Sequence, residues 1–408
     1  MASHSVTSQA PDPVQGLPGN IRKLSLLSAA HMFLVVMPVI VPFYRAHGLS
    51  MREVYLLQSV FALGTLVLEV PTGYAADLLG WKKTLIAGSL FYGASFSWLA
   101  RANGFTGFVA FELLAAVGVA LFSGSDVALL YASLGARSDV GRQGARAMGS
   151  LLFASQLGET AAALLCGALV GVSLRLPVAV NAATAWLPLG IALTLREPTT
   201  PRMKRGQHAE NLRALTLALF AQGRLLRLLL VNQVLFSSMT LIAVWAYQAY
   251  WSSQAIPIRH FGWLWATQNV AVALTARVAH RAEGEASLAP SAAFIAALPI
   301  VGFFGMALFE GWIGVAFGLA FSICRGMNQV VMRHALNVRV PEAMRATANS
   351  VTALGMRLLF AGLGPLFGYA MDQWGPAAAL RLGGFASLGI ALVASLPLVC
   401  EARRLRSP

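Results

Sequence analysis

The sequence predicts an all-α membrane protein with twelve transmembrane helices. Apolar residues make up 57% of the 408 residues and charged residues only 11%, and the mean hydropathy is +0.67. This composition lies outside the range of soluble globular domains. Long apolar stretches also recur along the chain, each approaching the roughly 20 residues that a helix needs to cross a bilayer. Their predicted cores are 24–44, 54–76, 84–100, 107–133, 148–172, 177–195, 226–250, 262–280, 288–308, 311–332, 346–370 and 377–399.

The positions of the charges predict how the chain is oriented. Of the 30 Lys and Arg residues, 22 fall in the terminal segments and the even-numbered connections, whereas six fall in the odd-numbered connections. The remaining two, Arg325 and Arg357, fall within spans. Such asymmetry is the pattern of the positive-inside rule. We therefore expect a multi-pass protein of the cell (inner) membrane, embedded in lipid, with both termini cytoplasmic. The net charge of +14 then needs no nucleic-acid partner.

Composition also divides the chain. Its polar, proline-containing beginning is typical of a disordered tail, and the first span that follows is long enough to be a retained helix rather than a cleaved signal. A long basic connection separates the first six spans from the last six. The expected segments are a disordered cytoplasmic tail (1–20), an N-terminal six-helix bundle (21–195), a cytoplasmic linker (196–224), a C-terminal six-helix bundle (225–400) and a second cytoplasmic tail (401–408).

Sequence repetition supports two related halves. The segment SGSDVALLYASL (123–134) in the fourth span resembles CRGMNQVVMRHAL (324–336) in the tenth, in an alignment that pairs Asp126 with Asn328. Two pseudo-symmetric bundles joined by a basic loop are typical of a transporter whose binding site lies between the halves.

The connection between the second and third spans carries a recognisable motif. Residues 69–85 read EVPTGYAADLLGWKKTL. The part GYAADLLGWKK resembles the signature loop of the major facilitator superfamily, in which Gly, three residues, Asp, two residues, Gly and Arg precede Lys or Arg. Glycine permits a tight turn or a close helix approach there, and the aspartate can accept hydrogen bonds from helix amino termini. The matching positions, which in that family form a gating loop that latches the cytoplasmic face, are Gly73, Asp77, Gly80, Lys82 and Lys83.

Two positions depart from the family pattern. Trp81 replaces the family arginine, and Ala132 in LLYASL replaces an acidic residue that related members with an EVPTG segment often carry. We expect the latch to rest instead on Asp77 with Arg142 or Arg146, and Trp81 to anchor at the membrane interface. As an alternative, the two lysines of the loop only set the topology.

Ionisable residues within spans are the next functional signal, because a charge in mid-membrane costs about 2.5 to 3.5 kcal/mol. Our hypothesis takes Asp126 as the principal proton carrier, Glu69 as the second and Glu159 as a third candidate. A buried carboxylate suits this role because it can alternate between a proton and a cationic partner.

Two carboxylates within spans also have a purely structural interpretation. Glu159 would pair with Arg357 or Arg325 in an ion pair between the halves. Glu112, near the outer end of the fourth span, would simply reach headgroup water.

The resemblance also implies where a substrate binds, since in the family the first, fourth, seventh and tenth spans line the central cavity. Polar residues on these spans would converge there from both halves, with Arg325 binding an acidic or polar substrate. The expected substrate-binding residues are Arg325, Asn328, His31, Gln248 and Asn232.

Sequence motifs for other energy sources or for catalysis are missing: the chain contains no GxxxxGK[ST] phosphate loop, HExxH, CxxC or EF-hand-like run. We therefore expect no cofactor, no metal and no enzymatic activity. The leading interpretation is a monomeric secondary transporter that works by alternating access. It would export a small molecule, such as a drug, metabolite or siderophore, in exchange for protons, as the EVPTG segment of efflux-type members implies.

Other interpretations compete with this one. The family's antiporter element, Gly-Pro-x-x-Gly in the fifth span, is replaced here by Gly158-Glu159-Thr160, whereas GPLFG occurs at 364–368 in the eleventh span. Proton-coupled uptake of a small nutrient or siderophore is therefore the alternative direction. A membrane-embedded enzyme or a lipid scramblase would share the hydropathy. An enzyme, however, should carry a convergent His, Asp or Ser constellation near one interface, and the sequence shows none. A receptor would usually carry a soluble output domain.

Overall fold

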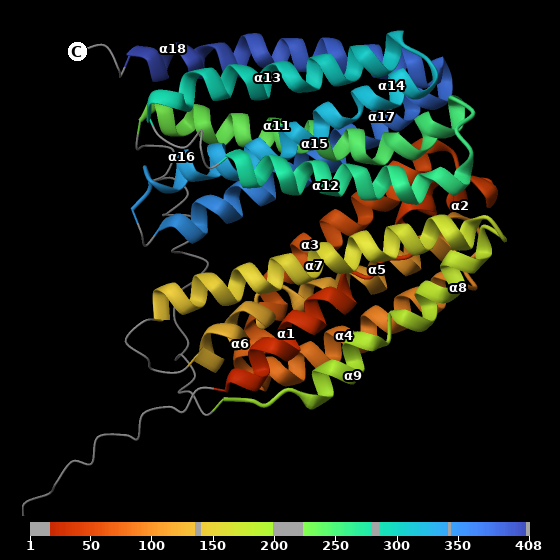
Figure 1. Cartoon of the computed structure of the whole chain (residues 1–408), viewed down its shortest axis with the longest axis vertical. Coiled ribbons are helices and arrows are strands. Elements are labelled where there is room, and N and C mark those ends of the chain that lie inside the picture. Colours follow the sequence, from red (N-terminus) through yellow and green to blue (C-terminus); the bar gives the residue numbers. More distant parts are fainter. Residues whose placement is uncertain (1–16, 135–139, 199–222, 280–284, 342–343, 405–408) are drawn as a thin grey trace, which may run out of the picture.

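Regular structure in this protein is helical. The computed structural model describes residues 17–134, 140–198, 223–279, 285–341 and 344–404, and the regular elements within these ranges are all helices. They form two groups, α1 to α9 and α11 to α18, that lie side by side (Figure 1). Eight helical segments are long and apolar enough to cross a membrane, judged by length and composition. The predicted all-α membrane fold of two bundles is therefore confirmed.

The first group accounts for the six predicted spans of the N-terminal half, three of which are interrupted. Most of the predicted linker and tails falls outside the described residues. The helices are α1 (Pro18–His31) with η1 (Met37–Val39) and α2 (Ile40–Ala46), α3 (Met51–Leu79), α4 (Trp81–Leu99), α5 (Gly104–Phe122) with α6 (Ser125–Leu134), α7 (Val140–Val170), and α8 (Arg175–Thr184) with α9 (Leu187–Thr194).

The second group accounts for the remaining spans. Gly375, at φ +80°, bends α17, so that its two arms belong to the eleventh and twelfth spans. The helices are α11 (Arg224–Ser253), η2 (Ile258–His260) leading into α12 (Phe261–Ala279), α13 (Glu285–Leu308), α14 (Gly311–Phe317) with α15 (Leu319–Met327), η4 (Asn328–Met332) and α16 (Arg333–Asn337), and α17 (Arg345–Ile390), which continues through η6 (Ala391–Ser395) into α18 (Leu396–Arg404).

Interruptions occur at matching places in the fourth and tenth spans. Gly124, at φ +81°, separates α5 from α6, and the π-helix η4 begins at Asn328. These are the segments that the sequence repeat aligned. Because π-helical turns are rare and often occur at functional sites, the shared irregularity supports both the repeat and a role for this depth of the bundle.

The two groups meet mainly through α3 against α17 and α7 against α12. Small residues allow this close approach. A Cβ atom on Gly262 of α12 would come within 2.6 Å of the Gly167 backbone nitrogen in α7, and one on Gly368 of α17 would come within 2.7 Å of the Tyr55 ring in α3. The halves therefore approach nearly to backbone contact along both seams, as small residues permit between membrane helices.

The bundle has two ends. We name the end that carries the start of α1, α16 and the end of α18 the terminal end, and the end that carries α2, α8 and α14 the distal end (Figure 1). At the distal end the Asp372 carboxylate of α17 accepts hydrogen bonds from the backbone amides of Met51 and Arg52, at 2.9 and 2.8 Å. Arg45 lies 3.6 Å from the same carboxylate. Asp372 thus caps the amino terminus of α3, where unpaired amides carry partial positive charge.

Gln248 of α11 adds a second contact between the halves near the distal end. Its Nε2 donates to the Met37 carbonyl and its Oε1 accepts from the Val41 amide, each at 2.9 Å. Both backbone groups belong to the interrupted part of the first span. The Tyr55 hydroxyl of α3 also donates to the Ile242 carbonyl of α11 at 2.7 Å. These bonds close the distal end.

Toward the terminal end the halves share one charged contact among the described residues. Glu69 of α3 and Arg357 of α17 form an ion pair at 2.9 Å, with side chains 46% and 23% exposed. Beyond Glu69, α3 presents exposed side chains such as Val70 and Leu79. The helices of the two groups also diverge in this direction (Figure 1). The described structure is therefore joined more tightly at its distal end.

Replacing Gly262 by alanine tests the close seam between α7 and α12. The added methyl group would overlap the α7 backbone, and overpacking of this kind costs about 1 to 3 kcal/mol. We expect a thermal midpoint several degrees below that of the wild type, measured by differential scanning fluorimetry of the purified protein. Gly389→Ala is the matched control, because that helical glycine has open space around it. Equal midpoints for the two variants would contradict the seam.

Replacing Asp372 by alanine tests the closure of the distal end. An amino-terminal cap contributes about 0.5 to 2 kcal/mol, so conformations open at that end should gain population by between about twofold and 30-fold. Pulsed electron paramagnetic resonance between labels on the exposed distal residues Asn103 and Glu310, with Cys400 replaced by serine, measures the change. Glu53→Gln is the control, since Glu53 caps the same helix from within its own half. An unchanged distance distribution in Asp372→Ala would refute the closure.

Candidate functional site

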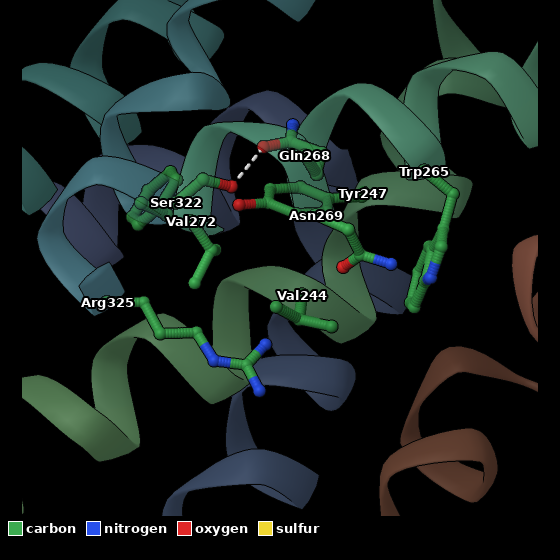
Figure 2. A pocket seen from close by; sticks show the side chains of 9 residues that line it. Val244, Tyr247, Trp265, Gln268, Asn269, Val272, Ser322 and Arg325 are labelled. Carbon is green, nitrogen blue, oxygen red and sulfur yellow. Dashed lines mark hydrogen bonds between the residues drawn. The ribbon is translucent and has the colours of Figure 1, made fainter. Parts of the chain in front are cut away.

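A polar pocket lies within the C-terminal half, between α11, α12 and α15. Hydrogen bonds engage several of its neutral side chains: the Ser322 hydroxyl donates to the Gln268 carbonyl oxygen, and the Tyr247 hydroxyl donates to the Gly318 carbonyl at 3.1 Å. We name it the Arg325 pocket, and its chemistry comes from Tyr247, Trp265, Gln268, Asn269, Ser322 and Arg325 (Figure 2).

Two donor groups of the Arg325 pocket are free for a ligand. The Arg325 side chain is exposed, and it forms no ion pair within the described ranges. The Asn269 Nδ2 atom is buried without a hydrogen-bond partner among the described residues. The two side chains come from α15 and α12 and lie on either side of Val244 (Figure 2). A guanidinium and an amide donor together suit the acceptor oxygens of a polar or acidic ligand.

Asn328 follows one turn after Arg325, at the start of η4. Its Nδ2 donates to the Ser237 hydroxyl at 3.0 Å. Its Oδ1, like the Oε1 of Gln233, is buried with no partner in the described part of the chain. Because buried polar atoms are seldom left unpaired, this turn of the tenth span is a second place where polar ligand atoms would be favoured.

Asn232, predicted to bind substrate, has another environment. Its Nδ2 donates to the carbonyls of Leu228 and Ala394 at 2.8 and 3.0 Å, and its Oδ1 accepts from the Ser395 hydroxyl at 2.7 Å. These bonds join α11 to the π-helix η6 of the twelfth span. Asn232 lines neither the Arg325 pocket nor the apolar pocket between the first four spans.

A second, largely apolar pocket lies within the N-terminal half, between the first four spans. Its described lining includes one side chain from the other half, Trp245 of α11. His31 lies at this pocket with its ring stacked on Phe122, the centroids being 4.2 Å apart. We name it the Glu112 pocket, and its lining includes His31, Tyr44, Gln58, Tyr92, Glu112 and Trp245.

The expectation that Glu112 reaches headgroup water is wrong. Glu112 is only 3% exposed, and its Oε1 accepts hydrogen bonds from the Tyr44 hydroxyl at 2.9 Å and from Gln58 Nε2 at 2.7 Å. Because α5 begins at Gly104, Glu112 lies about 12 Å inside the helix. The predicted start of the span, at residue 107, placed Glu112 closer to the end of the helix than the structure does.

The three predicted proton carriers are not brought together. Asp126 is half-buried in the first turn of α6, and its Oδ1 accepts from the Val127 amide at 2.8 Å. No hydrogen bond or ion pair links Asp126 to Arg325 or Asn328 among the described residues. Glu69, by contrast, bonds to the other half through its ion pair. Each carboxylate therefore has a separate environment.

The predicted ion pair of Glu159 with Arg357 or Arg325 is not formed. Arg357 pairs with Glu69 instead, and Glu159 Oε1 accepts from Trp265 Nε1 at 3.1 Å. Trp265 belongs to α12 and lines the Arg325 pocket. Glu159 thus contacts the wall of the polar pocket from across the seam between the halves.

The signature loop forms the tight turn that its glycine predicts. Gly80, at φ +101°, separates α3 from α4. The Glu197 carboxylate caps α4 by accepting from the amides of Trp81 and Lys82, at 2.9 and 2.7 Å. Trp81 is partly buried and packs against the hydrophobic core, and its anchoring at the membrane interface is still a prediction. The Glu197 contact was not predicted, because Glu197 is far from this loop along the chain.

The predicted latch partners of this loop are only partly described. Asp77 is exposed, as are Gly73 and Lys83. Neither Asp77 nor Arg146 forms an ion pair among the described residues, and the side chain of Arg142 lies outside them. The role of Asp77 as a latch is therefore still a prediction.

Comparisons with solved structures agree with this architecture. A mutant of the nucleoside transporter NupG has a TM-score of 0.76 at 14% identity, covering 96% of this chain and 100% of that chain. A bacterial homologue of the human lysosomal transporter Spinster, inward-facing and unoccupied, has a TM-score of 0.72 at 17% identity, covering 94% and 96%. A POT family transporter in complex with a thioalcohol-conjugated peptide has a TM-score of 0.77 at 12% identity, covering 97% and 99%. At these identities the likeness shows the fold alone.

The family itself follows from the sequence comparison. No curated protein gives a significant match. The family profile described as Major Facilitator Superfamily matches residues 24–365, which is most of the chain. Together with the two helical bundles, this match shows a multi-pass membrane transport protein and not an enzyme. The chain belongs to the Major Facilitator Superfamily.

Proposed function

We propose that this protein is a secondary transporter that works by alternating access and exports a small molecule in exchange for protons. The observation that carries the proposal is the unequal joining of the halves. Asp372 and Gln248 hold the distal end, whereas the charged contact that the described residues form toward the terminal end is the ion pair of Glu69 with Arg357. The halves are held together firmly at one end and by a breakable ion pair at the other. They can therefore exchange between an arrangement open at one end and an arrangement open at the other.

Protons are the proposed coupling ion because carboxylates lie where helices or halves meet. Protonation of Glu69 would remove the charge that attracts Arg357 across the seam. Asp126, the proposed principal carrier, lies in a half-buried turn beside the interruption of the fourth span. Glu159 contacts Trp265 of the opposite half. Each group would thus change a contact of the moving parts on taking up or losing a proton.

The proposed orientation places the terminal end in the cytoplasm of a cell with an inner membrane. The positive-inside asymmetry of the Lys and Arg residues supports it. In this orientation the closed distal end faces the outside. We propose that the monomer is the functional unit, since each half supplies one wall of the pathway.

The direction of transport has two candidates. Export is supported by the resemblance of the EVPTG segment to efflux-type members of the family. Uptake of a nutrient or siderophore is the second candidate, because the fifth span carries Gly158-Glu159-Thr160 where antiporters carry Gly-Pro-x-x-Gly. Proteoliposomes given a panel of small molecules, with a pH gradient imposed in either direction, distinguish the two, and absence of any pH-driven movement across a broad panel would contradict the proton-coupled proposal.

Replacing Asp126 by asparagine tests the coupling. The neutral side chain cannot release a proton, so pH-driven accumulation should be abolished while exchange of substrate without a gradient persists. Both are measured with the panel compound that the wild type transports. Glu310→Gln, at an exposed loop carboxylate, is the control and should behave as the wild type. If Asp126→Asn still concentrates substrate with normal pH dependence, Asp126 does not carry the proton, and Glu69→Gln and Glu159→Gln become the variants to measure.

Replacing Arg325 by alanine tests recognition in the polar pocket. A hydrogen bond to a charged group contributes about 1.5 to 3 kcal/mol, so binding of a transported compound with acceptor oxygens should weaken by about 10-fold to 100-fold. Isothermal titration calorimetry measures the affinity. Arg381→Ala, at an exposed arginine of the second arm of α17, is the matched control. Wild-type affinity in Arg325→Ala would show that this arginine does not contact the substrate.

A further inference from the structure

The Glu112 pocket has the lining of a small-molecule site and room for a compact ligand. Its cavity volume is about 250 Å³, just below the range of about 300 to 1,000 Å³ that small-molecule sites typically span. Most of its described lining is apolar or aromatic, and none of these lining residues is lysine or arginine. Glu112 is the carboxylate among them. A carboxyl group in an apolar chamber, with no lysine or arginine in its described lining, takes up either a proton or a cationic ligand.

The Glu112 carboxylate is positioned but not saturated. Tyr44 and Gln58 both donate to its Oε1. No described residue donates a hydrogen bond to its Oε2, although the side chain is only 3% exposed. The two donors fix the direction of the carboxyl group, and the second oxygen has its lone pairs available to a ligand in the pocket.

The aromatic side chains supply the remainder of a cation site. Tyr92, Phe96, Phe111 and Trp245 all line the pocket. Tyr92 and Phe96 lie edge to face with ring centroids 5.0 Å apart, and Phe96 and Phe111 do so at 5.3 Å. Aromatic faces attract organic ammonium groups through their quadrupole, most strongly where water is excluded. Rings grouped beside one buried carboxylate therefore favour an amphipathic cation over an anion.

The pocket is also connected to the contact that closes the distal end. Trp245 of α11 contributes to its wall from the opposite half. Gln248, three residues later on the same helix, bonds to Met37, and Met37 itself lines the pocket. A ligand in the pocket would therefore touch both sides of the seam that must open in alternating access.

We propose that the Glu112 pocket binds an amphipathic organic cation, an ammonium group on an aromatic or branched body, as a transported substrate. The ammonium group lies at Glu112 Oε2, and the apolar body packs against Phe96, Phe111 and Trp245. This inference rests on the proposed transport function and names its substrate class. Occupancy of the pocket biases the closure of the distal end, because Trp245 and Gln248 move as parts of one helix.

Binding of benzyltrimethylammonium to the purified full-length protein tests the proposal. Isothermal titration calorimetry should detect binding of this cation, and benzylsulfonate, which has the same aromatic body and the opposite charge, should bind at least about tenfold more weakly. Glu112→Gln keeps the acceptor for Tyr44 and Gln58 and loses the charge, so it should weaken cation binding at least about tenfold. Glu310→Gln, the control at an exposed carboxylate, should bind as the wild type does.

A second pair of variants keeps the test decisive if Glu112→Gln does not fold. Trp245→Ala removes an aromatic wall from the opposite half without touching the carboxylate and should weaken binding about threefold or more. Trp245→Phe retains a ring and should restore most of the affinity. Thermal unfolding and size-exclusion profiles establish that each variant is folded.

Three results would overturn the proposal. They are equal affinity for the cation and benzylsulfonate, unchanged cation affinity in a folded Glu112→Gln or Trp245→Ala variant, and absence of cation binding to the wild type. Transport of another compound by wild-type proteoliposomes, in the absence of cation binding, would leave the transporter function standing and reject only this substrate class. Wild-type cation binding that depends on Glu112, without any transport, would instead reject the transporter function and retain the site.

Discussion

The structure depends on one constraint: in hydrocarbon, every backbone donor and acceptor needs a partner within the protein. Continuous helices meet it by themselves, but the first span is interrupted between His31 and Met37. There the Val36 amide donates to Asn181 Oδ1 of the sixth span at 3.1 Å, while Gln248 of the seventh span satisfies Met37 and Val41. The interruption is therefore tolerated because two other spans supply amide side chains to it.

The hydrogen bonds that satisfy the backbone at this interruption also join the two halves. Asn181 fixes one side of the broken segment within its own bundle, and Gln248 fixes the other side from the opposite bundle. The same segment forms part of the wall of the Glu112 pocket, through Val36 and Met37. A structural requirement of the backbone thus places the contact between the halves directly beside a ligand-sized chamber. Movement of α11 cannot leave that chamber unchanged.

Several ionisable residues within the spans lie either at the seams between the halves or at the two pockets. Glu69 and Glu159 find partners across the seams, in Arg357 and Trp265. Glu112 finds neutral donors within its own bundle, and Arg325 has no ion-pair partner in the described ranges. Since an unpaired charge in this environment is costly, paired groups are suited to holding the halves together, and incompletely paired ones to meeting a ligand.

The sequence by itself determined the membrane class, the two bundles and the family, because hydropathy, Lys and Arg placement and the Gly80 turn depend on each residue and its chain neighbours. Only the tertiary structure decided which charges meet: Arg357 pairs with Glu69 rather than Glu159, and Glu112 is buried rather than at the headgroups. The physical reason is the rotation of each helix about its own axis, which the sequence of that helix does not always determine. A helix such as α5, apolar on nearly every face, has no polar stripe to fix its rotation about its axis. The direction in which Glu112 points is therefore set by packing against distant spans.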